Sequence, residues 1–439
     1  MNLKKICDEN IYKNKSIPIS LAKEILNSPE SGFKEHETSK KVLEFLRNLG
    51  LDNIESNIAR TGIKTKISTG RKGPNIAIIG ELDALPVPGH PHEDKKTNSA
   101  HACGHHIQIG SMVTALLGLM DKEILKDLSG EISFFAVPAE EFVEIEWRNN
   151  LRKNKEIEFL AGKQEMIKLG AFDDVDIALM THATPKKVKF SYGGTNNGLV
   201  AKFIEFIGKA SHAGVSPEKG INALNAANIS IAAINAQRET FRDEDHIRVH
   251  PIITKGGNVV SAVPDNVKME TFVRGANIES IIDANNKIDK CLKAGALATG
   301  AKVKITTIAG YLPINNDKKL LDIYKSNLDK NFDPSEIIEN DHIGGSTDMG
   351  DISNLIPAIH PYVGGSSGNS LHANDLVVND YDLSVIESGR MMAHTVIDLL
   401  NKDALEAKKI VNDFNPKFSK VSYLKFLRDL MKVEEFEFE

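Results

Sequence analysis

The feature that most constrains the fold of this 439-residue chain is an alternation of short apolar segments with helix-like segments. Residues 75–80 (NIAIIG), 131–137 (EISFFAV) and 175–181 (VDIALMT) have the length and composition of buried strands. Between the first two, apolar residues in 106–120 recur at the three- and four-residue intervals of a helix. Strands connected in this way predict a parallel or mixed sheet with helices on both faces.

Residues 196–312 carry a second and smaller pattern. Strand-like segments at 199–208, 246–254, 267–275 and 301–310 alternate with helix-like segments at 220–241 and 279–300. The order β-α-β-β-α-β is that of a ferredoxin-like unit. Residues 316–400 then return to an α/β pattern, with a strand predicted at 356–365, and 423–433 predict a helix on the surface. We therefore predict a mixed-sheet α/β domain made of 1–195 and 313–439, interrupted by an α+β domain at 196–312.

Composition excludes several classes of protein. The chain has 54 Lys and Arg against 60 Asp and Glu, a formal charge of −6, which argues against a nucleic-acid partner. No apolar run approaches the roughly 20 residues that a membrane span needs. The N-terminal residues lack the apolar core of a signal peptide, and three cysteines are too few for a disulfide framework. We therefore expect a cytoplasmic protein without membrane contact.

Side chains that can bind metal follow the predicted strands. Ligands of open α/β sheets collect outside the carboxyl ends of strands, so residues that follow different strands are expected to meet there. An additional histidine lies in a glycine-rich loop near the C-terminal end of the chain. The candidates are Glu81 and Asp83 in GELDALP, Cys103 and His105 in HACGHH, Glu140 and Glu141 in PAEE, His182 in LMTHAT, and His372 in SLHAND.

The chemistry of this set favours a transition metal. Thiolate, imidazole and carboxylate together suit zinc or another first-row ion better than calcium or magnesium. The pair Glu140–Glu141 offers one carboxylate as a ligand and another as a base for metal-activated water. Each signal alone has a simpler explanation, since an exposed Glu-Glu pair, a structural histidine or a buried cysteine is commoner than a ligand. Only their expected convergence favours the metal interpretation.

The same segments also resemble a known family. GELDALP (80–86), HACGHH (101–106), PAEE (138–141), the segments 162–182 and 208–227, GGSTDMGDIS (344–353) and SLHAND (370–375) occur in the order found in M20 metallopeptidases and amidohydrolases. The match lies with the branch that contains aminoacylase-like and p-aminobenzoyl-glutamate hydrolase-like enzymes. This resemblance implies a catalytic α/β domain that holds two divalent transition-metal ions, zinc or manganese. It also implies that the inserted ferredoxin-like unit is a lid that forms a homodimer, or that pairs with a related partner subunit.

Roles of single residues follow from the resemblance, motif by motif. Glu140 corresponds to the general base, and Asp83 to a group behind the ligands that orients one of them or tunes the base. His212 corresponds to a lid histidine that stabilises the oxyanion, often in the site of the partner subunit. Arg274 is a candidate to bind a substrate carboxylate. The implied metal ligands are Cys103, His105, Glu141, His182 and His372.

Three positions depart from the family pattern. His106 stands where relatives have Asp or Asn; it is either an additional ligand or a cap of the following helix, and we prefer the cap. His90 and His92 lie either in an ordinary loop on the substrate side, which we favour, or contribute further metal contacts. Many relatives have Asn three residues before the lid proline, where this chain has Ser261; Asn258 is close by and is the remaining candidate for a substrate contact.

The predicted activity is metal-dependent hydrolysis of an amide bond in N-acyl or aminobenzoyl amino acids or small peptides. Two alternatives remain open. One is a catalytically silent relative that binds metal or ligand without turnover, which His106 and Ser261 motivate. The other is an assembly protein whose lid-like unit mediates association.

Overall fold

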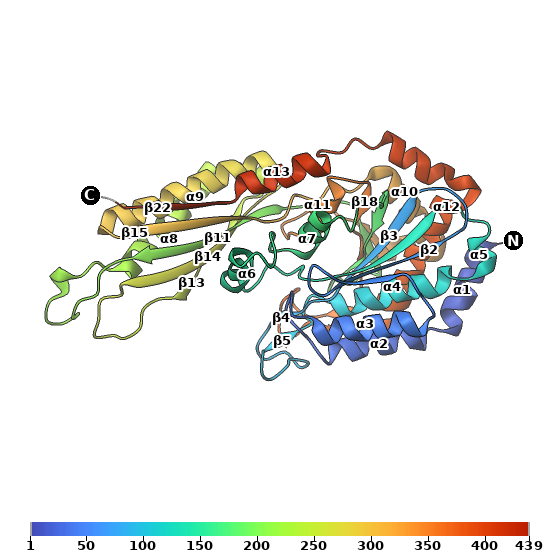
Figure 1. Cartoon of the computed structure of the whole chain (residues 1–439), viewed down its shortest axis with the longest axis horizontal. Helices are drawn as coiled ribbons and strands as arrows, with labels where there is room; N and C mark the ends of the chain where they lie inside the picture. The colour runs from blue at the N-terminus through green and yellow to red at the C-terminus, as the bar shows by residue number, and fades with distance from the viewer. Residues whose placement is uncertain (1, 438–439) are drawn as a thin grey trace.

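The structure, a computed structural model, describes residues 2–437 (Figure 1). Two sheets lie toward opposite ends of an elongated molecule, with the N-terminus at the end that holds the first sheet. That sheet has six strands, of which β6, β3, β7 and β18 run parallel to one another, whereas β2 runs antiparallel to both of its neighbours, β6 and β1. In spatial order they are β1 (Ile54–Ile58), β2 (Gly62–Ser68), β6 (Glu131–Val137), β3 (Asn75–Glu81), β7 (Ile177–Leu179) and β18 (Ala358–Ile359).

Alternate residues of the central strands enter two cores. In β3, Ile76 and Ile78 face one core, whereas Ala77 and Ile79 face the other, because successive side chains of a strand point to opposite faces. The larger core is closed by α1 (Leu3–Lys13), α2 (Ser16–Leu26), α3 (His36–Asn48), α4 (His105–Leu119), α5 (Lys122–Leu125), α10 (Lys318–Asn331) and α12 (Ser388–Asp413). The other is closed by α6 (Ile145–Lys153), α7 (Gly162–Leu169), α11 (Met349–Ser353) and α13 (Lys420–Leu430).

The second sheet carries the inserted α+β pattern. Its strand order around β11 is that of a ferredoxin-like unit, with β14 and β15 antiparallel to β11 on either side. Helices α8 and α9 pack against it through Ala226, Ala227, Ile288 and Leu292. Its elements are β11 (Gly198–Ile207), α8 (Ala223–Ala236), β12 (Arg248–Val249), β13 (Ile252–Lys255), β14 (Asn266–Gly275), α9 (Ile278–Thr299), β15 (Lys302–Ala309) and β22 (Lys432–Phe436). The predicted mixed-sheet fold with an inserted ferredoxin-like unit is therefore confirmed.

Short strand pairs lie around the edge of the first sheet. A small mixed sheet places β8 (His182–Ala183) beside β19 (Tyr362–Val363), which continues to β9 (Phe190–Tyr192) and β16 (Ile337–Glu339). Three further pairs are β4 (Leu85–Pro86) with β5 (Ser99–Ala100), β10 (Thr195–Asn196) with β17 (His342–Ile343), and β20 (Ser366–Ser367) with β21 (Val377–Val378).

Two local differences from the sequence prediction have physical causes. The strand predicted at 356–365 is divided into β18 and β19, which belong to different sheets; Pro361, which has no N–H to donate, lies between them. The C-terminal tail forms not only the predicted helix, as α13, but also β22, which pairs with β15 (Figure 1). The domain prediction placed all of 313–439 with the first sheet, so β22 corrects it for the last strand. The remaining boundaries stay predictions.

Candidate active site

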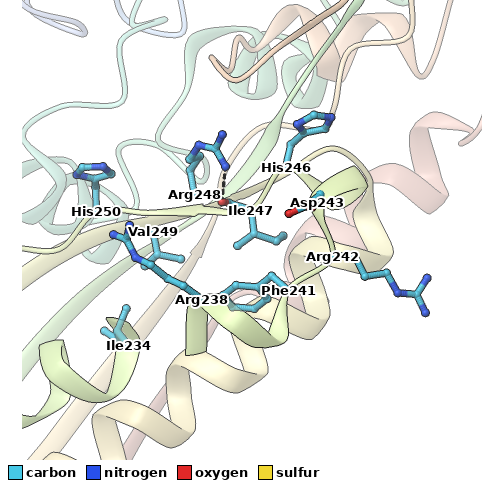
Figure 2. Close-up of a pocket in the computed structure, with 10 residues that line it drawn as sticks. All are labelled: Ile234, Arg238, Phe241, Arg242, Asp243, His246, Ile247, Arg248, Val249 and His250. Atoms are coloured by element: carbon cyan, nitrogen blue, oxygen red, sulfur yellow. Dashed lines mark hydrogen bonds between the residues drawn. The ribbon is translucent and has the colours of Figure 1, made fainter. Parts of the chain in front are cut away.

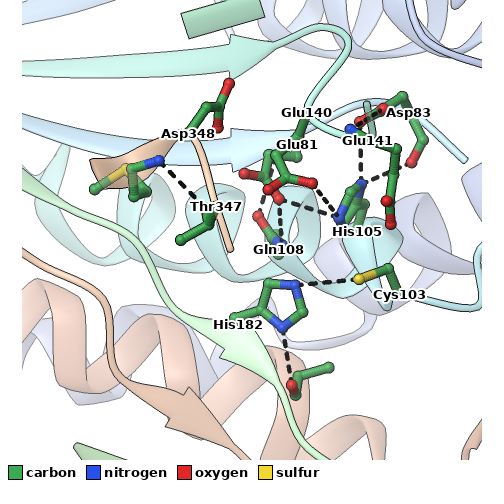
Figure 3. Close-up of polar contacts among 12 residues, drawn as sticks. Glu81, Asp83, Cys103, His105, Gln108, Glu140, Glu141, His182, Thr347 and Asp348 are labelled. Carbon is green, nitrogen blue, oxygen red and sulfur yellow. Dashed lines mark hydrogen bonds and ion pairs between the residues drawn. The ribbon is translucent and has the colours of Figure 1, made fainter. Parts of the chain in front are cut away.

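The predicted site residues lie at the carboxyl edge of three neighbouring parallel strands. Glu81 ends β3 and Asp83 follows it, while Glu140 and Glu141 come three and four residues after the end of β6. His182 begins β8 shortly after β7. Since β6, β3 and β7 are adjacent and parallel, their ends deliver these side chains to one place (Figure 3).

A tight loop brings Cys103 and His105 to the same edge. Gly104, the residue before α4, has φ of 81°, the left-handed region that glycine enters without strain. A Cβ at this position would also lie only 2.6 Å from the Cβ of Ala183. Both the backbone conformation and the available space therefore require glycine between the two predicted ligands.

The five predicted ligands converge. Cys103 Sγ lies 3.4 Å from His182 Nε2 and 3.3 Å from His372 Nε2, and His372 Nε2 lies 2.9 Å from Glu141 Oε1. Two groups with ligand atoms within 4.8 Å of one another share the Cys103 thiol: one adds His105 and His182, the other Glu141 and His372. Glu81, His105 and Glu140 form a third such group. The assignment of these residues as ligands remains a prediction.

Unpartnered atoms in the cluster fit a metal ion. His105 Nε2 and Glu141 Oε1 are buried and make no hydrogen bond of good geometry with the described residues, although His105 Nε2 lies 3.1 Å from Glu81 Oε2 and Glu141 Oε1 lies 2.9 Å from His372 Nε2. Buried polar atoms without a hydrogen bond are rare in folded proteins and call for a cause such as an ion. Thiol, imidazole and carboxylate donors form the set expected for zinc or a neighbouring first-row metal.

The charges around the cluster favour the ionised forms of its thiol and of one carboxyl group. Burial and Glu141 raise the pKa of Cys103, but the imidazoles of His182 and His372 and a hydrogen bond from His105 lower it to about 6 overall. Against the effect of burial, His372 lowers the pKa of Glu141 to about 2. The thiol and this carboxyl are therefore ionised at neutral pH, the form in which they bind metals.

Glu140 differs from its neighbour. Its carboxyl group is nearly buried, and its pKa is raised well above the ordinary value by burial and by the charges of Glu81 and Glu141. Its backbone carbonyl accepts a hydrogen bond from the hydroxyl of Tyr311. A glutamate in this environment can hold a proton near neutral pH, as a general base that later acts as an acid must.

Asp83 connects two predicted ligands. Its Oδ1 lies 3.1 Å and its backbone oxygen 2.8 Å from Nδ1 of His105, while its Oδ2 accepts a hydrogen bond of 2.8 Å from the backbone N–H of Glu141. Bonds of this kind fix the tautomer and the orientation of a metal-binding histidine. The placement fits the orienting role that was predicted for Asp83.

A buried lysine was missed in the sequence. Lys163 Nζ lies 2.5 Å from both Glu81 Oε1 and Asp348 Oδ1, and all three side chains are fully buried (Figure 3 shows Glu81 and Asp348). The charges of the two carboxylates more than offset burial, so the pKa of Lys163 lies above its usual value. A single lysine inside an amphipathic helix carries no sequence signal for this contact. Glu35 was missed as well; its carboxylate accepts the backbone N–H of Ala139, next to Glu140.

A cavity of about 290 Å³ opens over the cluster. Arg274, at the end of β14 in the second sheet, lines it together with the aromatic rings of Phe142, Phe272 and Tyr311. Four of the predicted ligands, Cys103, Glu141, His182 and His372, and the predicted base Glu140 also line it. The predicted substrate contact Arg274 is thus in place, and the cavity lies between the two sheets.

His212 and Asn258 do not reach this cavity. Both are exposed, and His212 Nδ1 accepts the backbone N–H groups of Gly214 and Val215. Leu199, near the start of β11, lines the cavity, whereas His212 follows the other end of this ten-residue strand. At about 3.3 Å per residue, the strand separates them by about 30 Å. Within a single chain the structure therefore does not bring either residue to the cluster.

The preferred interpretation of His106 is wrong. The cap position of α4 is Gly104, and no side chain caps this helix end. His106 is fully buried inside the first turn, with Nε2 3.4 Å from the hydroxyl of Tyr381. Together with His90 and His92, it lines a cavity other than the catalytic one. This placement does not decide whether the 86–100 loop lies on the substrate side.

Another cavity, of about 460 Å³, lies in the inserted unit beside β12 (Figure 2). Arg238, Arg242, Arg248 and His250 surround it, and their side chains are exposed. It contains none of the predicted catalytic or metal-binding residues. The chemistry therefore concentrates at the cavity between the sheets. Among residues 2–437, no helix combines the length and apolar character needed to cross a membrane.

Comparison with known proteins identifies the family of this chain. The model of the family described as "Peptidase family M20/M25/M40" matches residues 77–397. Xaa-Arg dipeptidase of Mus musculus is 26% identical over 407 residues, which cover 88% of this chain and 86% of the mouse protein. Hippurate hydrolase of Campylobacter jejuni is 26% identical over 370 residues, which cover 81% of this chain and 90% of the bacterial protein.

A solved structure shares the fold. A dinuclear metal-binding peptidase of the M20 family from Bacillus subtilis superimposes with a TM-score of 0.64 at 19% identity. The superposition covers 89% of this chain and 99% of that protein. The fold is thus shared over nearly the whole length.

Proposed function

Since this chain belongs to the peptidase family M20/M25/M40, as its motifs suggested, we propose that it hydrolyses an amide bond. The substrate class is an N-acyl amino acid, an aminobenzoyl amino acid or a small peptide. The observation that carries the proposal is the convergence of five ligand-type side chains and a protonatable glutamate, Glu140, on one cavity. The relatives named dipeptidase and hippurate hydrolase support this substrate class.

The proposed cofactor is a pair of divalent ions, zinc or manganese. One ion would be held by Cys103, His105 and His182, and the other by Cys103, Glu141 and His372, so that the thiolate is shared. When bound, such ions polarise a carbonyl oxygen and lower the pKa of a coordinated water to about 7. Nε2 of His105 and Oε1 of Glu141, both buried without a hydrogen bond of good geometry among the described residues, support this arrangement.

The chain itself supplies the proton transfer. We propose that Glu140 accepts a proton from the attacking water and returns it to the nitrogen of the leaving amine. Its raised pKa allows both roles, because the protonated form remains available at neutral pH. Asp83 holds His105 and the backbone of Glu141 in position while this happens.

Substrate recognition is proposed for Arg274. Among residues 2–437 no hydrogen bond or ion pair engages its guanidinium, which lies 5.3 Å from the centre of the Phe272 ring. Burial lowers the pKa of Arg274, although it stays charged. An unpaired guanidinium in a partly buried cavity is suited to bidentate binding of a carboxylate. The carboxylate of the product amino acid is the proposed partner.

The remaining roles depend on assembly. The length of strand β11, about 30 Å, separates His212 from the cavity. We therefore propose that His212 acts in the site of a second subunit, within a homodimer formed through the inserted unit. Asn258, exposed on the same unit, is proposed to contact substrate only in such an assembly. A cytoplasmic location remains part of the proposal because the chain has only three cysteines.

The test is hydrolysis by protein whose metals are removed with a chelator and restored singly as zinc or manganese. N-benzoylglycine, N-acetyl amino acids, p-aminobenzoyl-glutamate and dipeptides ending in arginine form the panel. We expect amino acid release only after metal is restored, and release about 10²–10⁴-fold slower by Glu140→Gln carrying the same metal content. Metal-loaded, folded protein that cleaves none of these amides would refute the proposal and favour a silent binding protein.

A further inference from the structure

Four histidines line a cavity of about 260 Å³ that is separate from the catalytic cavity. Two of them, His101 and His106, come from the same HACGHH loop that carries Cys103 and His105. Cys103 lines the catalytic cavity, whereas His101 and His106 line this other one. The loop therefore forms a wall between two clusters of ligand-type side chains. The other two histidines, His90 and His92, come from the 86–100 segment.

The rings in this cavity differ in how they are bonded. Both nitrogens of His90 are occupied: Nε2 bonds to the carbonyl of Leu376 at 2.7 Å, and Nδ1 accepts the backbone N–H of His92. In contrast, both ring nitrogens of His101 and Nδ1 of His106 are buried without a hydrogen bond among the described residues. His101 and His106 are 3% and 1% exposed. Buried imidazoles without partners are costly unless something occupies the cavity between them.

The spacing of the two buried rings suits a shared ion. The centroids of His101 and His106 lie 5.5 Å apart, with 54° between the ring planes. Two imidazoles that bind one tetrahedral ion through Zn–N bonds of about 2.0–2.1 Å have centroids about 5 Å apart. The separation of the two rings is close to this value, but no three of the histidines described at this cavity have ligand atoms within 4.8 Å of one another, so the rings must turn to share an ion.

Further donors are available at the same cavity. His92 is exposed, and its ring makes no hydrogen bond with residues 2–437, so it is free to turn inward. The hydroxyl of Tyr381 lies 3.4 Å from His106 Nε2. Lys23, whose ammonium lies 4.9 Å from the centre of the Tyr381 ring, is exposed and screened by solvent. Carboxylates are absent from the lining, which favours an imidazole-preferring ion over calcium or magnesium.

We propose that this histidine cavity binds one first-row transition-metal ion, such as Zn²⁺, Ni²⁺ or Cu²⁺, through His101, His106 and His92. The site is distinct from the proposed catalytic pair and does not depend on amide hydrolysis. Because its ligands flank Cys103 and His105 in the chain, an ion bound there fixes the loop that presents both catalytic ligands. His90, held by its two hydrogen bonds, positions the 86–100 segment that carries His92.

Cobalt titration of the full chain tests this proposal, since Co²⁺ reports its ligands by absorption. A catalytic ion bound by Cys103 gives a thiolate-to-cobalt charge-transfer band, whereas a histidine-only site gives visible d–d bands without one. We expect an equivalent of Co²⁺ that adds d–d absorption after the charge-transfer band has saturated. His106→Asn should lose this equivalent. His92→Ala should weaken it by more than the roughly 10–100-fold that loss of an outer-sphere partner costs.

His92→Ala protects the test against misfolding, because His92 is exposed and its side chain supports no packing in the core. His250→Ala removes an exposed histidine of the inserted unit and is the matched control; it should retain the additional equivalent. Cobalt binding that ends when the charge-transfer band saturates overturns the proposal. So does an additional equivalent that persists in both His106→Asn and His92→Ala, or a cavity that binds only an added anion such as phosphate.

Discussion

The catalytic cavity and the second sheet each bury a lysine, but they surround it differently. In the second sheet, Lys202 Nζ lies 2.5 Å from Asp289 and 3.0 Å from the hydroxyl of Thr307. Lys432 lies 3.4 Å from Asp289 and pairs in turn with Glu434, so two lysines face two carboxylates. Near the catalytic cavity, Lys163 is shared by two carboxylates, Glu81 and Asp348. The first arrangement balances its charges within the fold, whereas the second does not.

The difference extends to the whole catalytic cluster. Without metal, Lys163 and Arg274 are the two cations of the cluster that need no imidazole proton, and six acidic groups lie with them: Glu81, Asp83, Cys103, Glu140, Glu141 and Asp348. The remaining positive charge depends on protons on His105, His182 and His372, whose pKa values the neighbouring acidic groups raise despite burial. Burying negative charge without compensation is costly, so such a cluster requires cations or protons. The raised pKa of Glu140 and the proposed pair of divalent ions are two responses to the same excess. A buried charge that the fold balances indicates structure, and one that it leaves unbalanced indicates function.

The largest expected effect is a loss of activity on substitution in the catalytic cavity, which no substitution in the second sheet should reproduce. Glu140→Gln removes the proposed base while preserving shape, so kcat should fall about 10²–10⁴-fold, the usual contribution of general acid–base catalysis. Metal content and unfolding midpoint should match the wild type. Steady-state kinetics with metal analysis measures both, and a Glu140→Gln enzyme with wild-type kcat would contradict the assignment.

The next prediction concerns stability. Lys163→Met leaves Glu81 and Asp348 buried without their cation, which should lower the free energy of unfolding of metal-free protein by about 3–5 kcal/mol. Urea denaturation of the metal-free variant and wild type measures the difference. A loss below about 1 kcal/mol would show that the two carboxyls simply take up protons.

The matched change in the second sheet sharpens the comparison. Lys202→Met alone should also destabilise, since it leaves Asp289 with only the more distant Lys432. The double variant Lys202→Met/Asp289→Leu should recover most of that loss, because replacing a whole buried ion pair by apolar side chains is often neutral or stabilising by about 1–4 kcal/mol. Its kcat should remain that of the wild type. If the double variant unfolds as readily as the single one, the pair is not the self-contained unit described above.

The smallest expected effect is a pH dependence of metal-free protein. His372 lowers the pKa of Glu141 from 4.5 to about 2, so this contribution to stability is present above pH 4.5 and is lost as pH falls toward 2. Glu141 in turn raises the pKa of His372 from 6.5 to about 12, so the same contact is fully present below pH 6.5 and is lost as pH rises. The stabilisation therefore peaks between pH 4.5 and 6.5.

Its size is limited by exposure. The side chain of His372 is 49% exposed, so solvent screens the pair and less than about 1 kcal/mol is expected. His372→Gln should abolish the difference between pH 5.5 and pH 8.5 in urea denaturation of metal-free protein. An unchanged pH profile in the variant would place the titration elsewhere.

The sequence predicted what depends on local pattern. Buried strands of six and seven mostly apolar residues were visible at 75–80 and 131–137, and the polar residues that follow them meet because parallel strands share an edge. The ferredoxin-like order of the inserted unit was visible for the same reason. Convergence of Cys103, His105, Glu141, His182 and His372 followed from these patterns together with the family motifs.

What escaped prediction depends on contacts between distant segments. Strand β22 is short and mostly charged, and it becomes a strand by pairing with the edge of β15. Lys163 lies in a helix with no motif of its own, yet it pairs with residues 82 and 185 positions away. His106 was predicted to cap the helix that follows HACGHH. The helix begins one residue earlier, at His105, and its cap position is Gly104 in the left-handed conformation.

The most direct test of the central claim is anomalous diffraction from crystals grown with zinc or manganese. We predict two anomalous peaks in the catalytic cavity, about 3.5–4 Å apart, each within bonding distance of Cys103. A peak in the histidine cavity would be a separate site and would not substitute for them. Crystals with full metal occupancy elsewhere and no peak among these five side chains would contradict the account.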